Sequence, residues 1–281
     1  MKPRYLLYLF LFNLALLTGG CDWECLFFHR NSKLELVLTK ENAYLCFPRW
    51  SPDDRIFYLE KIAEPWWGYG TLKVVNLDGT DEREVIDGLW TYFDLSDDGS
   101  KIAVTNDTII LLITPEGEVL NTLYHAQPYV ECLRFSHSDT FLYYYAWGGG
   151  GTQRGFYRLN LYTGEEEFVK PYEEMEVDGF EVIADTIVFI GSYPSLNPKN
   201  SQYLITQEGG LYLFSLSTGD TIRLDARPYC NSGIKFPSWD PSGKDVIFSS
   251  GEVIGCMDPG CTVRNLEIWI LRDVLEEGGV R

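Results

Sequence analysis

The chain has 281 residues, of which 45% are hydrophobic, 15% aromatic and 23% charged. Apolar residues at this level are spread along the whole chain, which excludes global disorder and is ample for a buried core. The 23 Lys and Arg residues against 41 Asp and Glu give a formal net charge of −18. Because so negative a surface repels phosphate backbones, we expect no nucleic-acid partner.

The N-terminus has the organisation of an export signal. Lys2 and Arg4 precede an apolar run over 5–17, and the small residues 18–20 lead to Cys21. This order is typical of a signal peptide, and the run is shorter than the roughly 20 apolar residues that span a bilayer. The Leu-Thr-Gly-Gly-Cys junction resembles the lipobox of bacterial lipoproteins. That resemblance implies an acylated (palmitate-bearing) Cys21 and a protein anchored to a bacterial membrane, at the periplasmic face or the cell surface. An ordinary cleaved signal is the alternative.

Five segments share one plan, in which an aromatic or apolar residue comes four positions before a Ser, Ala or Asp, followed by a polar turn and a β-rich run. The shared position falls at Ser51, Ser96, Ser136, Ala184 and Asp240, in steps of 45, 40, 48 and 56 residues. A period near 40–50 with four short strands is typical of a β-propeller blade. We therefore predict an all-β fold and a β-propeller of five blades. Six blades are the alternative if the step 184–240 contains a degenerate unit.

The last unit is incomplete, and the β-rich segment 33–40 belongs to no unit. Pairing 33–40 with the last blade would remove an open sheet edge and join the two ends of the chain. The expected organisation is a signal peptide over 1–20, an anchor and linker over 21–32, one propeller domain over 33–273 and a polar C-terminal tail over 274–281. We expect a monomer.

Two of the turns carry a recognisable string, WSPDD at 50–54 and WDPSG at 239–243. Both resemble the W-S-P-D-G pattern of TolB-like propeller repeats, a WD40-like group, over residues 33–273. The resemblance implies the fold and no particular activity. Three units depart from the pattern, and the additional N-terminal domain of the TolB-like proteins is missing.

The second connection of most blades is long, whereas the first and third turns are tight and polar. These long connections cover 61–71, 146–155, 192–210 and 250–265. Long loops gathered on one face of a rigid scaffold often carry function. Their candidate binding residues are Trp66, Trp67, Tyr69, Trp147, Tyr193, Tyr203 and Met257. These aromatic rings would contact a protein or glycan partner, or would instead fold down and cap the blade cores.

Six cysteines remain without Cys21, which permits up to three disulfides in an exported protein. Cys256 and Cys261 are the first candidate pair, because the turn at 258–260 returns the chain upon itself. Cys25 with Cys46 is the second. No Cys-x-x-Cys pair occurs and the three histidines are scattered. We therefore expect no metal and no other cofactor.

The familiar catalytic motifs are absent from the sequence, including the nucleophile elbow, the zinc-protease helix and the phosphate loop. We therefore expect a binding or scaffold module without catalytic residues, whose protein or glycan partner docks on the long-loop face. The alternative is a five-bladed glycoside hydrolase or lyase with carboxylates at the central opening. The candidate carboxylates on the long-loop face are Glu41, Asp107, Glu131 and Asp178.

Overall fold

The structure is a computed structural model. It describes residues 30–277 except 42, 62–68, 107–108, 125–128, 149–152, 173–178, 184–185, 189–191, 208–209, 230–231 and 258–259. The side chains of 124, 188, 192, 207, 252–265 and 276–277 also lie outside the description. The expected signal peptide and Cys21 are therefore outside the described residues. No helix in the described part of the chain is long and apolar enough to cross a membrane.

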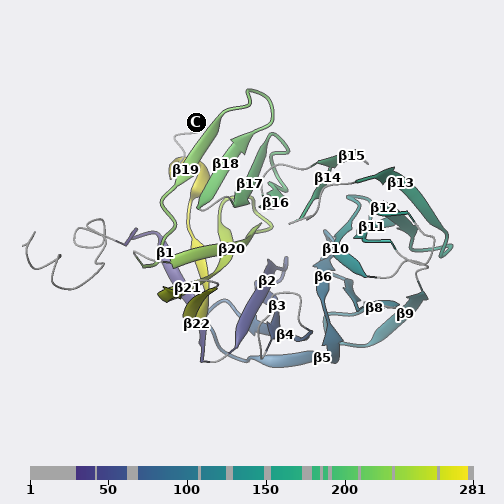
Figure 1. The fold of residues 1–281 in the computed structure, drawn as a ribbon, viewed down its shortest axis with the longest axis horizontal. Helices are drawn as coiled ribbons and strands as arrows, with labels where there is room; N and C mark the ends of the chain where they lie inside the picture. The colour runs from purple at the N-terminus through teal and green to yellow at the C-terminus, as the bar shows by residue number, and fades with distance from the viewer. Residues whose placement is uncertain are drawn as a thin grey trace, which may run out of the picture.

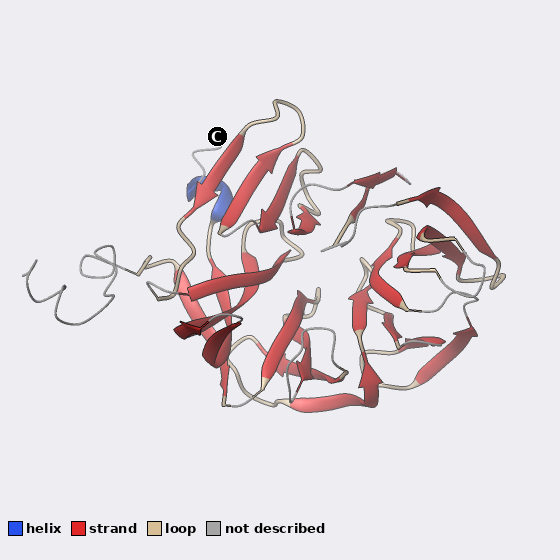
Figure 2. Ribbon diagram, viewed as in Figure 1, coloured by secondary structure: helices blue, strands red, loops and turns tan. Residues whose placement is uncertain are grey.

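Five four-stranded antiparallel sheets are arranged around a central axis as the blades of a β-propeller (Figures 1 and 2). The all-β, five-bladed prediction is confirmed. The first blade contains β2 (Tyr44–Trp50), β3 (Arg55–Lys61), β4 (Gly70–Asn76) and β5 (Arg83–Trp90). The second contains β6 (Tyr92–Leu95), β7 (Ile102–Thr105), β8 (Ile109–Ile113) and β9 (Val119–Tyr124). The third contains β10 (Val130–Phe135), β11 (Phe141–Ala146), β12 (Gly155–Asn160) and β13 (Glu166–Pro171).

The two remaining four-stranded blades follow a short hairpin. This hairpin, β14 (Glu181–Ile183) with β15 (Thr186–Val188), forms a two-stranded sheet of its own. The fourth blade contains β16 (Ser192–Leu196), β17 (Tyr203–Gln207), β18 (Leu211–Ser215) and β19 (Thr221–Leu224). The fifth contains β20 (Ser232–Trp239), β21 (Val246–Met257), β22 (Gly260–Leu271) and β1 (Leu34–Lys40), and the helical turn α2 (Val274–Glu277) follows it.

The N-terminal strand closes the ring as predicted. Strand β1 pairs antiparallel with β22, from Leu34 opposite Leu271 to Lys40 opposite Leu266. The pairing covers the β22 edge, which would otherwise present unpaired N–H and C=O groups. Arg272 reinforces the closure through Glu35 at 2.7 Å and Asp245 at 2.6 Å.

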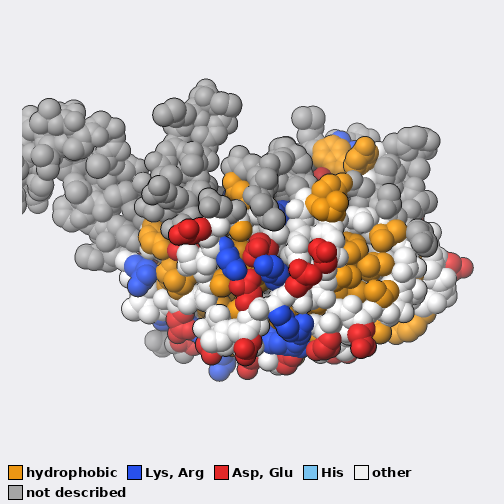
Figure 3. Space-filling view, turned by 90° about the horizontal axis from the view of Figure 1, so that it is seen from below, with side chains coloured by type: hydrophobic (Ala, Val, Ile, Leu, Met, Phe, Trp, Pro, Cys, Tyr) orange, Lys and Arg blue, Asp and Glu red, His pale blue; other side chains and the backbone are white. Residues whose placement is uncertain are grey.

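Charged side chains also tie the closing strand to the first blade. Lys40 Nζ lies 2.5 Å from Glu82 Oε2 and 3.7 Å from Glu60 Oε2, and Lys73 Nζ lies 3.0 Å from Glu60 Oε1. The hydroxyl of Tyr58 donates to Glu82 at 2.7 Å. Figure 3 shows the rim that faces downward in Figure 1, where acidic and basic side chains are interspersed. The net negative charge of the chain therefore does not form a single-sign field on this side.

The fourth repeat was predicted in the wrong place. We expected 180–191 to supply the inner strands of a blade and 192–210 to be a long loop. Instead 192–207 supplies the inner strands β16 and β17, and the hairpin β14–β15 stands separately between the third and fourth blades (Figure 1). The reason lies at Asn197, whose Oδ1 accepts the N–H groups of Lys199 and Asn200, both at 2.9 Å. Asparagine here makes the turn that Ser or Asp makes in the other blades.

Candidate functional site

The central axis is closed at one level by aromatic rings from four inner strands. Phe47 of β2 lies 4.3 Å from Phe236 of β20 and 5.0 Å from Tyr92 of β6, measured between ring centroids. Tyr193 of β16 lies 4.6 Å from Phe236. These rings occupy the repeat position four residues before the turn, and we call them the aromatic plug. The four rings therefore pack together across the central axis.

Backbone bulges accompany the plug. Phe47, Cys132, Tyr193 and Phe236 have φ between 51° and 56°, in the left-handed region that bulky residues rarely adopt. Each of their strands shows a register shift at this point. A bulge bends the strand and re-aims its side chains, and such bulges are often found next to functional sites.

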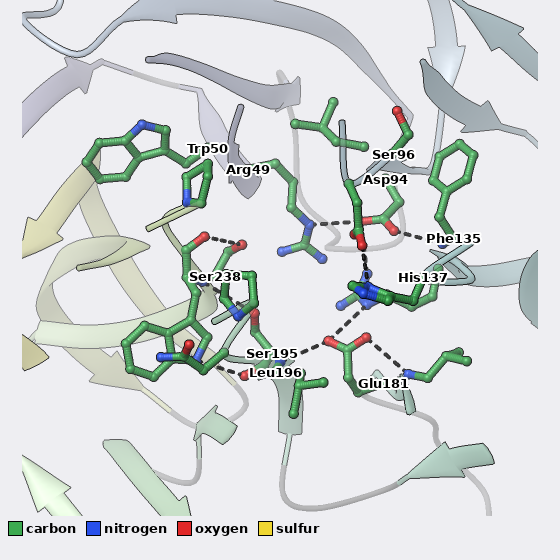
Figure 4. A pocket seen from close by; sticks show the side chains of 18 of the residues that line it. Arg49, Trp50, Asp94, Ser96, Phe135, His137, Glu181, Ser195, Leu196 and Ser238 are labelled. Carbon is green, nitrogen blue, oxygen red and sulfur yellow. Dashed lines mark hydrogen bonds and ion pairs between the residues drawn. The ribbon is translucent and has the colours of Figure 1, made fainter. Parts of the chain in front are cut away.

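A cavity of about 500 Å³ opens between the plug and the tight first turns of the blades. Its wall is formed by the ends of the inner strands. In each four-stranded blade, the side chain two positions after the repeat position of the plug lines the cavity. One side chain of β14 also lines it (Figure 4). These residues are Arg49, Asp94, Arg134, Glu181, Ser195 and Ser238.

Four of these side chains form a chain of ion pairs across consecutive inner strands. Arg49 Nε lies 3.1 Å from Asp94 Oδ1, and Arg134 Nη1 lies 3.6 Å from the same oxygen. Arg134 Nε lies 3.9 Å from Glu181 Oε2. Backbone N–H groups hold the acids in place, with Phe135 donating to Asp94 at 3.0 Å and Leu196 donating to Glu181 at 3.1 Å. The formal charges of the four side chains cancel, which is how a protein tolerates buried charge.

Burial and mutual charge shift the pKa of these groups. Burial, with the neighbouring Arg134, lowers the pKa of Arg49 to about 10, so Arg49 stays protonated at neutral pH. Burial alone would lower the pKa of Arg134, but Asp94 and Glu181 outweigh it and hold the value above the usual range. Burial raises the pKa of Glu181, and Arg134 offsets this only in part.

Arg49 presents its guanidinium to the cavity. Its residue is only 9% exposed, and its Nε is engaged with Asp94. No protein atom among the described residues accepts a hydrogen bond from its Nη1 or Nη2. Figure 4 shows this end of the side chain directed into the open space. A buried cation with two uncommitted N–H₂ groups is an anion-binding group.

The opposite wall is polar and contains hydroxyl groups together with the charged side chains of Lys199 and Asp240. Ser195 and Ser238 are both buried, and the indole Nε1 of Trp239 donates to the carbonyl of Ser195 at 3.1 Å. At the cavity mouth, His137 Nδ1 contacts the carboxylate of Asp97. This wall offers hydroxyl groups that would complement an uncharged polar part of a ligand.

The structure describes the side chains of four of the aromatic residues predicted for the long-loop face, and three of these pack against other side chains. Tyr193 lies in the aromatic plug, and Tyr203 of β17 packs against the core beside the fifth blade. Trp147 is covered by the Arg154 guanidinium at 4.1 Å and packs against the third blade. Among the candidates whose side chains the structure describes, only Tyr69 is exposed, at 43%. Trp66 and Trp67 lie outside the described residues.

The segment 250–265 is a β-ribbon rather than the expected loop. Strands β21 and β22 stay paired to their tips, with Cys256 opposite Cys261 and Met257 opposite Gly260. Their side chains lie outside the description. Cys46 is a buried free thiol whose pKa is raised by burial to about 11, which does not support the expected pairing with Cys25. Cys25 itself is outside the described residues.

The carboxylates at the central cavity differ from those expected. Glu41 is exposed and Glu131 begins β10 at the opposite end from the cavity, while Asp107 and Asp178 lie outside the described residues. Asp94 and Glu181 line the cavity instead. The sequence does indicate the cavity positions. In the strings FPRWS, YFDLS and CLRFS, a charged residue interrupts an apolar strand two positions before the shared serine.

Within the described residues, no group of three or more His, Cys, Asp or Glu side chains is arranged to hold a metal ion. No protein-family model matches the chain, and a search of the curated proteins finds no match. The propeller fold therefore rests on the structure itself, and the TolB-like resemblance of the turns remains an expectation.

Proposed function

We propose that the protein is an exported, lipid-anchored β-propeller that binds a glycan or protein partner by taking a small group of it into the central cavity. The observation that carries this proposal is the central cavity itself, which is lined by buried polar side chains and faces the uncommitted guanidinium end of Arg49. The Nη1 and Nη2 groups of Arg49 have no acceptor among the described residues, so a ligand in the cavity can accept hydrogen bonds from them. A cavity of about 500 Å³ is large enough for one sugar unit or one side chain.

Binding without catalysis is favoured by how the two cavity acids are held. Asp94 Oδ1 faces both arginines and its Oδ2 accepts the Phe135 N–H. Glu181 accepts the N–H groups of Val182 and Leu196 through its two oxygens. Carboxylates engaged in this way orient the arginines, whereas a catalytic acid or nucleophile needs an oxygen directed at the substrate.

The anchor would join the propeller on the cavity face. Leu34, the first residue of β1, lies opposite Leu271, and Leu271 lies opposite Val246, which in turn lies opposite the cavity residue Trp239. These pairings place the start of β1 at the cavity end of the fifth blade. A lipid on Cys21 would therefore hold the cavity face toward the membrane side of the molecule.

Photocrosslinking of the full chain in its native membrane tests which face binds. p-Benzoylphenylalanine placed at Ser201, on the cavity rim, is expected to capture the partner. The same probe at the exposed Tyr69 is the matched control on the other face and is expected to capture nothing. Capture at Tyr69 alone would place binding on the long-loop face and overturn the proposal.

A glycoside hydrolase or lyase is the second candidate, because Asp94 and Glu181 meet at one cavity and burial raises the pKa of Glu181. That function requires release of reducing ends from an envelope polysaccharide, and its loss in Glu181→Gln. Under our proposal the unmodified protein releases none.

A further inference from the structure

The orientation of the Arg49 guanidinium suits one kind of ligand group. Its Nε is fixed by Asp94 at 3.1 Å, and the planar guanidinium must then present Nη1 and Nη2 along the edge that faces the cavity. Two parallel N–H donors on a planar fork match the two oxygens of a carboxylate. A single lysine ammonium at this place would carry the charge without that geometry.

We propose that the cavity recognises a carboxylate group, which sits in a bidentate pair on Nη1 and Nη2 of Arg49. This inference rests on the proposed function and names the ligand chemistry of the same site. The rest of the ligand would extend toward the hydroxyl groups of Ser195 and Ser238. A uronic acid and a peptide carboxylate share this chemistry.

The charge balance of the cavity selects a monoanion over a phosphate. Arg49 and Arg134 are already balanced by Asp94 and Glu181, which lie within 3.9 Å of the guanidinium groups. With Lys199, Asp97 and Asp240 also counted, the cavity lining has a formal charge of −1. A carboxylate would take it to −2, whereas a phosphate dianion would take it to −3. Because the chain carries −18 overall, its field also disfavours multiply charged anions.

Acetate and acetamide are the matched probes, because they have the same shape and differ in charge. The full chain is labelled with ¹⁵N-arginine in detergent, and the Nε–H signal of Arg49 is assigned by its disappearance in Arg49→Lys. Asp94→Asn, which alters the acceptor of that N–H, gives a second assignment if Arg49→Lys does not fold. Arg55, an exposed arginine paired with Asp53 on the same face, is the internal control signal.

Acetate is expected to shift the Arg49 signal in a saturable manner at constant ionic strength, with the Arg55 signal unchanged. Inorganic phosphate should bind at least tenfold more weakly, and acetamide should cause no shift. Equal shifts with acetamide, tighter binding of phosphate, or no shift with acetate would each overturn the carboxylate assignment. Capture at Ser201 by the crosslinking experiment would still stand in those cases, which separates failure of this inference from failure of the proposed function.

Discussion

Arg49 Nε contacts Asp94 Oδ1 at 3.1 Å, and the two residues hold the same position in the inner strands of adjacent blades. Neither residue is more than 9% exposed. The pair therefore joins the first and second blades inside the cavity, where water does not weaken it as it would at the surface. Asp94 also contacts Arg134 of the third blade, so this carboxylate is the common partner of both buried arginines.

Asp94→Asn is expected to destabilise the fold by about 3–5 kcal/mol, because it leaves two buried guanidinium groups with one remaining acid. Urea unfolding measures the change in free energy. Asp53→Asn is the matched control, since Asp53 pairs with Arg55 at 2.6 Å on the surface and should cost less than about 1 kcal/mol. Equal losses in the two variants would contradict a special role for the cavity pair.

We expect Glu181 to stabilise the folded protein more at acidic pH than at neutral pH. Burial raises the pKa of its carboxyl above the usual 4.5 in the folded state, so the folded state binds the proton more tightly than the unfolded state. Its favourable contribution is complete below pH 4.5 and is lost as the pH rises through the folded-state pKa. The stability of the unmodified protein relative to Glu181→Gln should therefore fall as the pH rises above 4.5.

Asp98 is the control, because its contribution to stability depends on pH in the opposite direction. Hydrogen bonds from the backbone N–H and hydroxyl of Ser100 lower the pKa of Asp98 to about 2, from a usual 3.8. Its contribution is present above pH 3.8 and is lost as the pH falls toward 2. The stability of the protein relative to Asp98→Asn should thus be flat over the range in which the Glu181 difference changes, as measured by urea unfolding at each pH.

Deletion of 33–40 should open the ring. It removes the buried side chains of Leu34 and Val37, each worth roughly 1.5–3 kcal/mol, and exposes the β22 edge. We expect a lower melting temperature and self-association in size-exclusion chromatography with light scattering. Deletion of the tail 278–281 is the control and should leave both unchanged. A monomeric 33–40 deletion with unaltered melting would contradict the closure.

Repeats in which Ser or Asp makes the first turn could be predicted from the sequence. The repeat in which Asn197 makes this turn could not. The hydroxyls of Ser51 and Ser96 each donate to a backbone carbonyl of their turn, whereas Asp240 accepts the N–H of Lys244. Their strings identified three of the blades, and the unpaired segment 33–40 identified the closure. At Asn197 the flanking Pro194 and Pro198 made an inner strand resemble a loop. An inner strand that carries a bulge tolerates such residues, because the local ladder is already interrupted.

The cavity residues were not among the site residues predicted from the sequence, and the reason is physical. Long connections indicate where a scaffold tolerates insertion, but the cavity is lined by side chains of the strands themselves. Arg49 of the cavity lies two positions after Phe47 of the plug, so the aromatic plug and the polar cavity wall come from the same strand. Aligning the repeats identifies both positions, whereas their convergence on one axis requires the closed ring.

Cys256 and Cys261 should form a disulfide. Residues directly opposite in an antiparallel ladder have Cα atoms about 4.5–5.5 Å apart, which is within the span of a disulfide. Alkylation of the native protein followed by peptide mapping should label neither cysteine until a reductant is added. Cys46 is the control, because its buried thiol should resist alkylation with or without reductant until the protein is unfolded. Labelling of Cys256 and Cys261 without reductant would contradict the disulfide.

Cys21→Ser should release the protein from the membrane. The sequence before Cys21 predicts cleavage and acylation there, and each buried CH₂ of an acyl chain contributes about 0.8 kcal/mol to membrane attachment. Cys25→Ser is the matched control four residues away and should stay in the membrane fraction after carbonate washing. Intact mass spectrometry should show the acyl chains on the unmodified protein and on Cys25→Ser, but not on Cys21→Ser. Equal partitioning of the two variants would mean that Cys21 is not the lipid attachment site.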